Sequence, residues 1–316
     1  LALAQNTALQ ITAKGEDTAQ AALKAARGKN NFSLSASSGL TTGKSSRASR
    51  TDTGNASLSA TLPLYTGGAN EANIKSGEIG VDAARLATER ERENLRYSVI
   101  KAYYDVLEAK RTVAIDQESV DKYQAHLTNV EQLYQAGSKA RLDVLRSSVE
   151  LANARQTLIK SQNDYEVKIV VLKNLLRLDQ HEPLTLTEDF TYVPFYPAME
   201  ACVAYAFENR KDLIIDQYTL RQRELDVDAA RAGYLPEVSL SASASEEREF
   251  HPQSSDSHNY SAGVRVSWNI FDSGVTAAAV DKAKTARDVA ALTLQKDQED
   301  VDQAVRQAYY NMREAE

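Results

Sequence analysis

Histidine and cysteine, which commonly carry out catalysis or bind metal ions, are few and scattered in this chain. The histidines are His126, His181, His251 and His258. They are too dispersed to form a ligand pair on one helix, although His251 and His258 share a stretch with Asp256, which leaves a surface metal site open. The sequence contains no GxSxG, Walker or HExxH pattern. It therefore predicts no catalytic residue, no metal ligand and no cofactor, and a protein that is not an enzyme.

Serine has the most regular spacing of the polar residue types, because it alternates with apolar residues in four segments, but these strand serines are not interpreted as nucleophiles. These segments are predicted strands at 31–40, 56–65, 237–245 and 259–270. Successive side chains of a strand point to opposite faces, so each strand has one apolar and one small polar face. The apolar positions include Leu34, Leu58, Leu62, Leu240, Val264, Val266 and Trp268. The polar positions include Ser35, Ser59, Ser241 and Arg265.

Two interpretations of these strands are open at this point. Strands of about 9–11 residues are long enough to cross a bilayer when tilted. The alternative is a sheet of a soluble protein with one face in water, but such a face usually carries longer polar side chains such as Lys and Glu. A face made mostly of serine suits a lining where space is limited.

Composition excludes several classes of protein. The net charge of −7 argues against a general nucleic-acid-binding role. No stretch approaches about 18 consecutive apolar residues, so no transmembrane helix is predicted. The 6 prolines and 13 glycines among 316 residues favour long, uninterrupted helices. The single cysteine, Cys202, lies in an apolar run and is interpreted as a packed thiol.

The chain contains an internal repeat at a fixed offset of 206 residues, the distance from Leu62 to Trp268. The block LPLYTGG at 62–68 recurs as WNIFDSG at 268–274, and AYYD at 102–105 recurs as AYYN at 308–311. We therefore predict one structural unit used twice. The first copy covers 1–177, a linker 178–197, and a shorter second copy 198–316. Because the second copy stops early and the chain begins inside a helical pattern, we expect segments to be missing at both ends.

Long helices are predicted around the strands. Apolar residues step by four and three from Leu95 to Tyr134, a heptad seam that favours a long helix at 69–134. A breaker at 135–139 with Gly137 at its centre predicts a tight turn, followed by an antiparallel helix at 140–177. Further helices are predicted at 1–28, at 198–233 and at 275–316.

The order helix, strand, loop, strand, long helix, tight turn and helix, used twice, resembles the TolC family of outer-membrane ducts. The segment AARAGYLP at 229–236 is similar to the family's transition from helix to strand. The corresponding segment of the first copy, AARGKNN at 25–31, lacks the proline. Two segments resemble the family's strand-to-helix corner, namely 65–68, with Gly67 and Gly68, and 271–274, with Gly274. The stretches 134–145 and 209–213 resemble its tip turn and the start of its second repeat.

The resemblance implies a fold class, an α+β membrane protein whose trimeric 12-stranded β-barrel continues into a long antiparallel coiled-coil barrel. Four strands cannot close a barrel, whereas three chains provide twelve. The apolar strand faces would then meet lipid and the serine faces, with Arg265, would line the pore. The barrel would lie in the outer membrane, the helices in the periplasm, and the linker 178–197 in the equatorial region. The acidic constriction of the family would fall beyond residue 316.

The resemblance also implies partners, namely a homotrimer, a periplasmic adaptor (membrane fusion) protein and an inner-membrane pump, with no nucleic acid. The predicted adaptor-contact tip comprises Tyr134, Ala136, Gly137, Ser138, Lys139 and Arg141. We expect an exit duct of a tripartite efflux or type I secretion system. The alternatives are a structural envelope tether without transport and a soluble coiled-coil scaffold.

Overall fold

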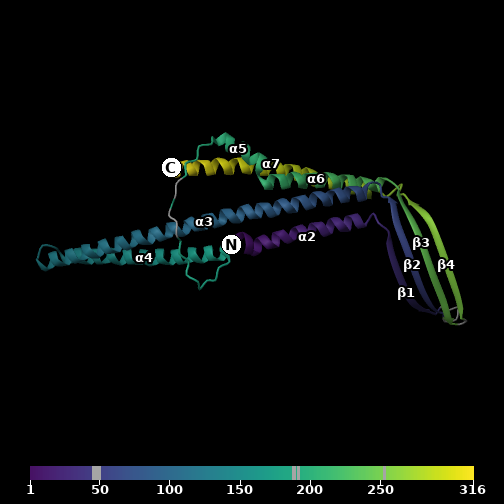
Figure 1. Ribbon diagram of the computed structural model, residues 1–316, viewed down its shortest axis with the longest axis horizontal. Coiled ribbons are helices and arrows are strands. Elements are labelled where there is room, and N and C mark those ends of the chain that lie inside the picture. Colours follow the sequence, from purple (N-terminus) through teal and green to yellow (C-terminus); the bar gives the residue numbers. More distant parts are fainter. Residues whose placement is uncertain (45–50, 187–189, 191–192, 252–253) are drawn as a thin grey trace. The chain divides into compact units, whose positions relative to one another are not determined.

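The computed structural model describes residues 1–44, 51–186, 190, 193–251 and 254–316 (Figure 1). The first helices and strands are α1 (Ala2–Gln5), α2 (Thr7–Gly28), β1 (Ser33–Gly43), β2 (Thr51–Tyr65), α3 (Ala69–Gln135) and α4 (Arg141–Leu176). They are followed by α5 (Met199–Asn209), α6 (Lys211–Arg231), the 3-10 turn η1 (Ala232–Tyr234), β3 (Glu237–His251), β4 (Ser255–Ser267) and α7 (Val275–Ala315).

The chain divides into two compact units. One contains Leu1–Thr12 and Thr88–Tyr196, and the other contains Ala13–Ala87 and Pro197–Glu316. These units follow contacts rather than the sequence repeat, so the repeat boundaries at 177 and 198 stay predictions. Of the predicted linker 178–197, residues 187–189 and 191–192 lie outside the described residues, as do 45–50 and 252–253.

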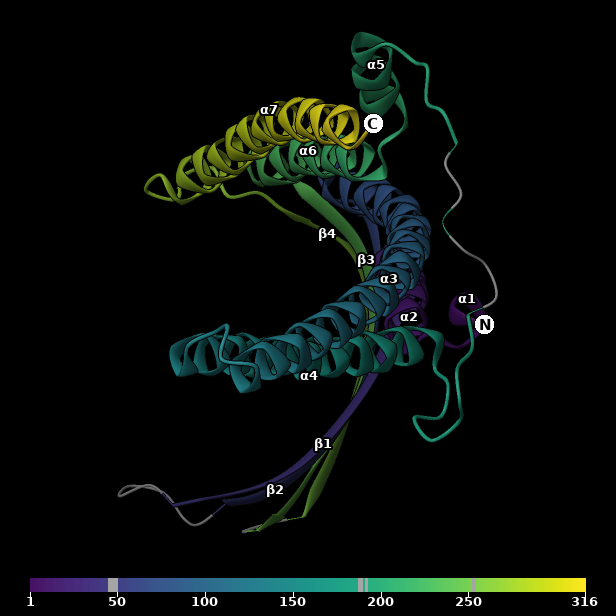
Figure 2. The ribbon, with the colours of Figure 1, turned by 90° about the vertical axis from the view of Figure 1, so that its left-hand side faces the viewer.

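One antiparallel sheet dominates the second unit, with strand order β1-β2-β3-β4 (Figures 1 and 2). The segment predicted as a loop between the last two strands is largely strand, because β3 continues past 245 to His251 and β4 begins at Ser255 rather than 259. The charged residues of this stretch suggested a loop. Arg248 and Asp256 instead form a cross-strand pair, with 2.7 Å between Nε and Oδ1, which accommodates both charges within the sheet.

The other strand bounds also differ from the predicted ones. β1 covers 33–43 rather than 31–40, and β2 begins at Thr51 rather than 56. β4 ends at Ser267, so Trp268 lies just past the strand, where its indole Nε1 donates a hydrogen bond to the Tyr234 carbonyl at 3.0 Å.

Helices of the second unit pack beside one another. Helices α6 and α7 lie side by side in both views (Figures 1 and 2), and Ala206, Leu213 and Val301 form a buried cluster between α5, α6 and α7. Salt bridges join α2 to α3, including Arg27 to Glu78 at 2.7 Å.

The first unit is built on an antiparallel hairpin of α3 and α4. Buried residues along α3 follow the predicted seam, namely Leu95, Ala102, Val106, Ala109, Val120, Leu127 and Val130. Leu172 of α4, 1% exposed, packs against Val106. Tyr123 and Tyr134 are on the seam by spacing but stay exposed, as suits an aromatic ring whose hydroxyl remains in water. Among the described residues, no helix is both long and apolar enough to cross a membrane.

Candidate functional site: the two faces of the sheet and the tip of the hairpin

The ladder of the sheet places the predicted apolar residues on one face. Leu58 lies opposite Ala36 and Ala244, and Leu240 lies opposite Leu62 and Val264. Leu34 and Val264 are each 62% exposed. The hydrophobic clusters identified among the described residues include none from the strands. Within the part of the chain that the structure describes, this apolar sheet face is therefore left exposed. Trp268 lies beyond the ladder, so the strand register does not fix its face.

The opposite face of the sheet carries rows of small, mostly hydroxyl-bearing residues that run across the four strands. One row contains Ser35, Ser59, Ser243 and Ser261, and the rows on either side of it contain Ser37, Ser57, Ser245 and Asn259, and Ser33, Thr61, Ser241 and Gly263. The Oγ atoms of Ser35 and Ser59 are 2.7 Å apart, and those of Ser243 and Ser261 are 2.8 Å apart. These hydrogen bonds join β1 to β2 and β3 to β4, and the three rows form a polar surface without a charged residue.

The strand-to-helix corners repeat in backbone geometry as well as in sequence. Gly67 and Gly68 have φ of 65° and 91°, and Ser273 and Gly274, at the 206-residue offset, have φ of 55° and 88°. Asp272 caps α7, because its Oδ2 accepts a hydrogen bond from the Thr276 N–H at 2.7 Å. Hydrogen bonds from Thr276 and Gly274 lower the pKa of Asp272. In the first copy Thr66 Oγ1 accepts from the Asn70 N–H at 3.3 Å in the same position.

We expect Gly67→Ala to destabilise the corner more than Gly68→Ala. Both residues have positive φ, which costs any residue with a Cβ about 1–2 kcal/mol. A Cβ at Gly67 would also lie 2.8 Å from the Ala232 carbonyl oxygen, whereas a Cβ at Gly68 meets nothing within 4 Å. The clash should add about 1–3 kcal/mol. Thermal unfolding of both variants in detergent measures the difference, and equal melting temperatures would contradict this packing.

The hairpin tip is a tight turn with a defined backbone. Ser138 N donates to the Leu133 carbonyl at 2.9 Å and Gly137 N to the Tyr134 carbonyl at 3.0 Å, the pattern of a Schellman helix end. It requires the left-handed conformation of Gly137, whose φ is 77°. At the start of α4, Asp143 Oδ2 accepts from the Ala140 N–H at 3.2 Å. The predicted tip residues are together and exposed, namely Tyr134, Ala136, Gly137, Ser138, Lys139 and Arg141.

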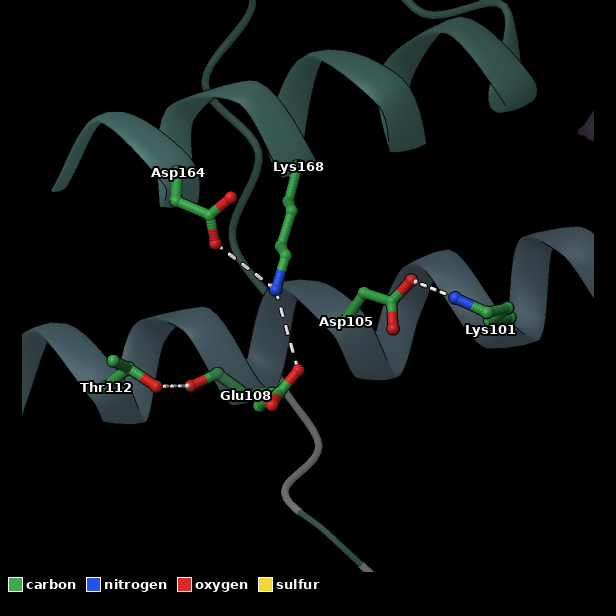
Figure 3. Close-up of polar contacts among 6 residues, drawn as sticks. All are labelled: Lys101, Asp105, Glu108, Thr112, Asp164 and Lys168. Atoms are coloured by element: carbon green, nitrogen blue, oxygen red, sulfur yellow. Dashed lines mark hydrogen bonds and ion pairs between the residues drawn. The ribbon is translucent and has the colours of Figure 1, made fainter. Parts of the chain in front are cut away.

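A polar bridge that the sequence analysis missed joins the two helices of the hairpin (Figure 3). Lys168 Nζ of α4 lies 3.5 Å from Glu108 Oε2 of α3 and 3.3 Å from Asp164 Oδ2. Burial lowers the pKa of Lys168, but hydrogen bonds and charge from Asp164 and Glu108 outweigh it, so the pKa is raised. Spacing along one helix identifies only the Asp164 pair, because the Glu108 contact comes from tertiary packing.

Lys168→Met should lower the stability of the hairpin by about 0.5–1 kcal/mol, since water screens a pair whose Glu108 side chain is 67% exposed. The pKa of Lys168 in the folded protein is above its ordinary 10.5. Its stabilisation is therefore complete below about pH 10 and is lost as pH rises through the folded value. Thermal melts of both proteins at pH 8 and above pH 11 test this. A difference that grows with pH would contradict the bridge.

The remaining candidate residues do not assemble into a site. Asp256 pairs with Arg248, and His258 lies opposite Glu246 in the sheet. The side chain of His251 lies outside what the structure describes. Within the described ranges, no three His, Cys, Asp or Glu residues are close enough together to hold a metal ion.

A four-stranded antiparallel sheet with an uncovered apolar face and a hydroxyl face, joined to long helices through repeated corners, is the architecture of one chain of a TolC-type outer-membrane channel. The outer membrane efflux protein family model matches residues 1–176 and 203–316. The chain belongs to this family, which consists of outer-membrane channel proteins rather than enzymes. This confirms the predicted fold class, since the sheet and helices are consistent with one chain of a trimeric barrel.

Individual relatives and solved structures agree with the family assignment. The outer membrane efflux protein BepC of Brucella suis is 21% identical over 89% of this chain, and the pyoverdine export outer membrane protein OpmQ of Pseudomonas putida is 25% identical over 83%. The chain spans 61% of BepC and 54% of OpmQ. The structure of the outer-membrane channel OprN has a TM-score of 0.78 at 21% identity, covering 99% of this chain and 73% of OprN.

Proposed function

We propose that this protein is an exit duct of the outer membrane that passively conducts solutes or polypeptides outward in a tripartite efflux or type I secretion system. Three copies would close a 12-stranded barrel in the outer membrane, with the helices forming a tunnel in the periplasm. OpmQ is named for export and BepC for efflux. These names support an outward direction of passage.

The observation that carries this proposal is the pair of chemically opposite sheet faces. On the apolar face, Leu34 and Val264 are each 62% exposed. An exposed apolar surface of this kind is unfavourable in water, and lipid would cover it. The serine face supports a water-filled lumen, because small hydroxyl side chains leave space and bind water. β1 and β4 are the two edges of the sheet. An open edge in lipid leaves backbone N–H and C=O groups unsatisfied, so closure by pairing β4 of one copy with β1 of the next is required.

The geometry of the hairpin tip supports a protein partner at this end of the helices. The backbone of the tip is fixed by the Schellman hydrogen bonds, and its small residues Ala136, Gly137 and Ser138 are exposed, which supports close approach by a helix of another protein. We assign this surface to a periplasmic adaptor that connects the duct to an inner-membrane pump.

Conductance separates a duct from an envelope tether with the same helices. The full-length protein, purified as a trimer and inserted in a planar bilayer, should give discrete current steps whose size scales with salt concentration. A trimer that inserts without conducting would favour the tether. A protein that is extracted from cells without detergent would favour the soluble scaffold.

Two neighbouring cysteine variants provide a matched control in a background where Cys202 is replaced by alanine. Ser59→Cys should react with a membrane-impermeant methanethiosulfonate reagent and the adduct should reduce the current. Leu58→Cys, the adjacent residue on the other face, should react slowly and leave the current unchanged. The reverse pattern would invert the assignment of the two faces.

A further inference from the structure

Arg265 of β4 lies on the serine face, in the row next to that of Ser33 and Ser241. In this row and the three hydroxyl-bearing rows that follow it, up to the row of Ser37, it is the only charged residue. Its cross-strand partner is Ser239, which in turn lies opposite Pro63. The next charged residues on this face are Glu237, toward the helices, and Glu247 and Glu249, toward the far end of β3. A single guanidinium therefore projects from a wall of hydroxyl groups.

The side chain of Arg265 pairs with none of the described residues. It is exposed, and no hydrogen bond or salt bridge to it occurs among the residues the structure describes. Its neighbour on the same face of β4 is Gly263, which has no side chain. A Cβ placed on Gly263 would have no atom within 4 Å, so the space beside Arg265 is open. The other cationic residue of the sheet ladder between β3 and β4, Arg248, is by contrast bound by Asp256 through Nε and Nη2 at 2.7 and 3.1 Å.

We propose that Arg265 is a specificity-determining residue, an anion-binding point in the wall of the lumen that favours solutes bearing carboxylate or phosphate groups. This rests on the proposed trimeric duct, in which three copies of Arg265 would surround one lumen. Guanidinium binds oxyanions through paired N–H donors, and rings of arginine select anions in pores. The row on one side of Arg265 contains only Ser33, Thr61, Ser241 and Gly263, and on the other side Glu237 lies in the next row. Among the described residues neither Glu237 nor any other carboxylate pairs with Arg265, so its guanidinium is available to a solute.

Block of single-channel current by inorganic tripolyphosphate tests this site in the full-length protein. We expect the half-blocking concentration to rise about tenfold in Arg265→Ser, as expected for loss of a charge-assisted contact. Arg265→Lys should retain part of the block, because it keeps the charge but loses the paired geometry.

Moving the charge to another residue of the same row distinguishes loss of the anion contact from a structural effect of the substitution on the barrel. The double variant Arg265→Ser with Ser239→Arg places a guanidinium on the adjacent strand of the same face, and it should recover the block. A half-blocking concentration that does not change in Arg265→Ser would overturn the anion site while leaving the duct intact. A wild-type trimer that forms no channels would overturn the duct proposal and this inference with it.

Discussion

Leu58→Arg is expected to destabilise the membrane-inserted protein by about 2–4 kcal/mol, the cost of an arginine near the midplane on a lipid-facing strand. Leu58 lies in the middle of β2, opposite Ala36 and Ala244, on the apolar face. Val264→Arg on β4 should behave in the same way. The free energy of unfolding is measured by titrating urea against the folded fraction in phospholipid vesicles.

Ser59→Arg is the matched control, because it introduces the same side chain one residue away on the hydroxyl face. It should narrow the proposed lumen and reduce conductance with little change in the free energy of unfolding. If arginine is tolerated equally at 58 and 59, the two faces do not differ in environment, and the barrel assignment is wrong.

The regular parts of the fold could be predicted from the sequence because their periods are long and uninterrupted. Seven buried residues of α3 follow the heptad seam, and the serine alternation predicts the two faces of the sheet. The 206-residue repeat extends to the backbone, since Ser273 and Gly274 reproduce the positive φ of Gly67 and Gly68. The second copy has serine at 273, whereas the equivalent position 67 is glycine because a Cβ there would clash with the Ala232 carbonyl oxygen. This is a tertiary contact, which no local sequence pattern contains.

The features that the sequence did not predict depend on residues brought together from distant positions. Arg248 and Asp256 extend β3 and β4 beyond their predicted ends, because a cross-strand ion pair offsets the polarity that suggested a loop. Lys168 reaches Glu108 sixty residues away, on the other helix of the hairpin. In the same way, the position of Arg265 at the end of three rows without a charged residue is evident only once the register aligns the four strands.

Ala136→Glu and Ser138→Glu are expected to reduce adaptor crosslinking at least about tenfold and to reduce export with it. A carboxylate placed against a closely packed partner helix loses water without gaining a partner, which costs about 1–3 kcal/mol or more. The trimer should still assemble, since neither residue is on the Leu127–Val130 seam and the tip hydrogen bonds of Ser138 and Gly137 use backbone atoms.

Site-specific crosslinking in cells, with a photoreactive residue at Lys139, measures contact with the adaptor in each variant. Gln156→Glu is the control, because it adds the same charge at an exposed position of α4 several turns from the tip and should leave crosslinking and export unchanged. Loss of export in Ala136→Glu with undiminished crosslinking would show that the tip acts in gating rather than docking. A fall in both, restored by a lysine introduced on the adaptor hairpin, would place the new carboxylate directly at the contact.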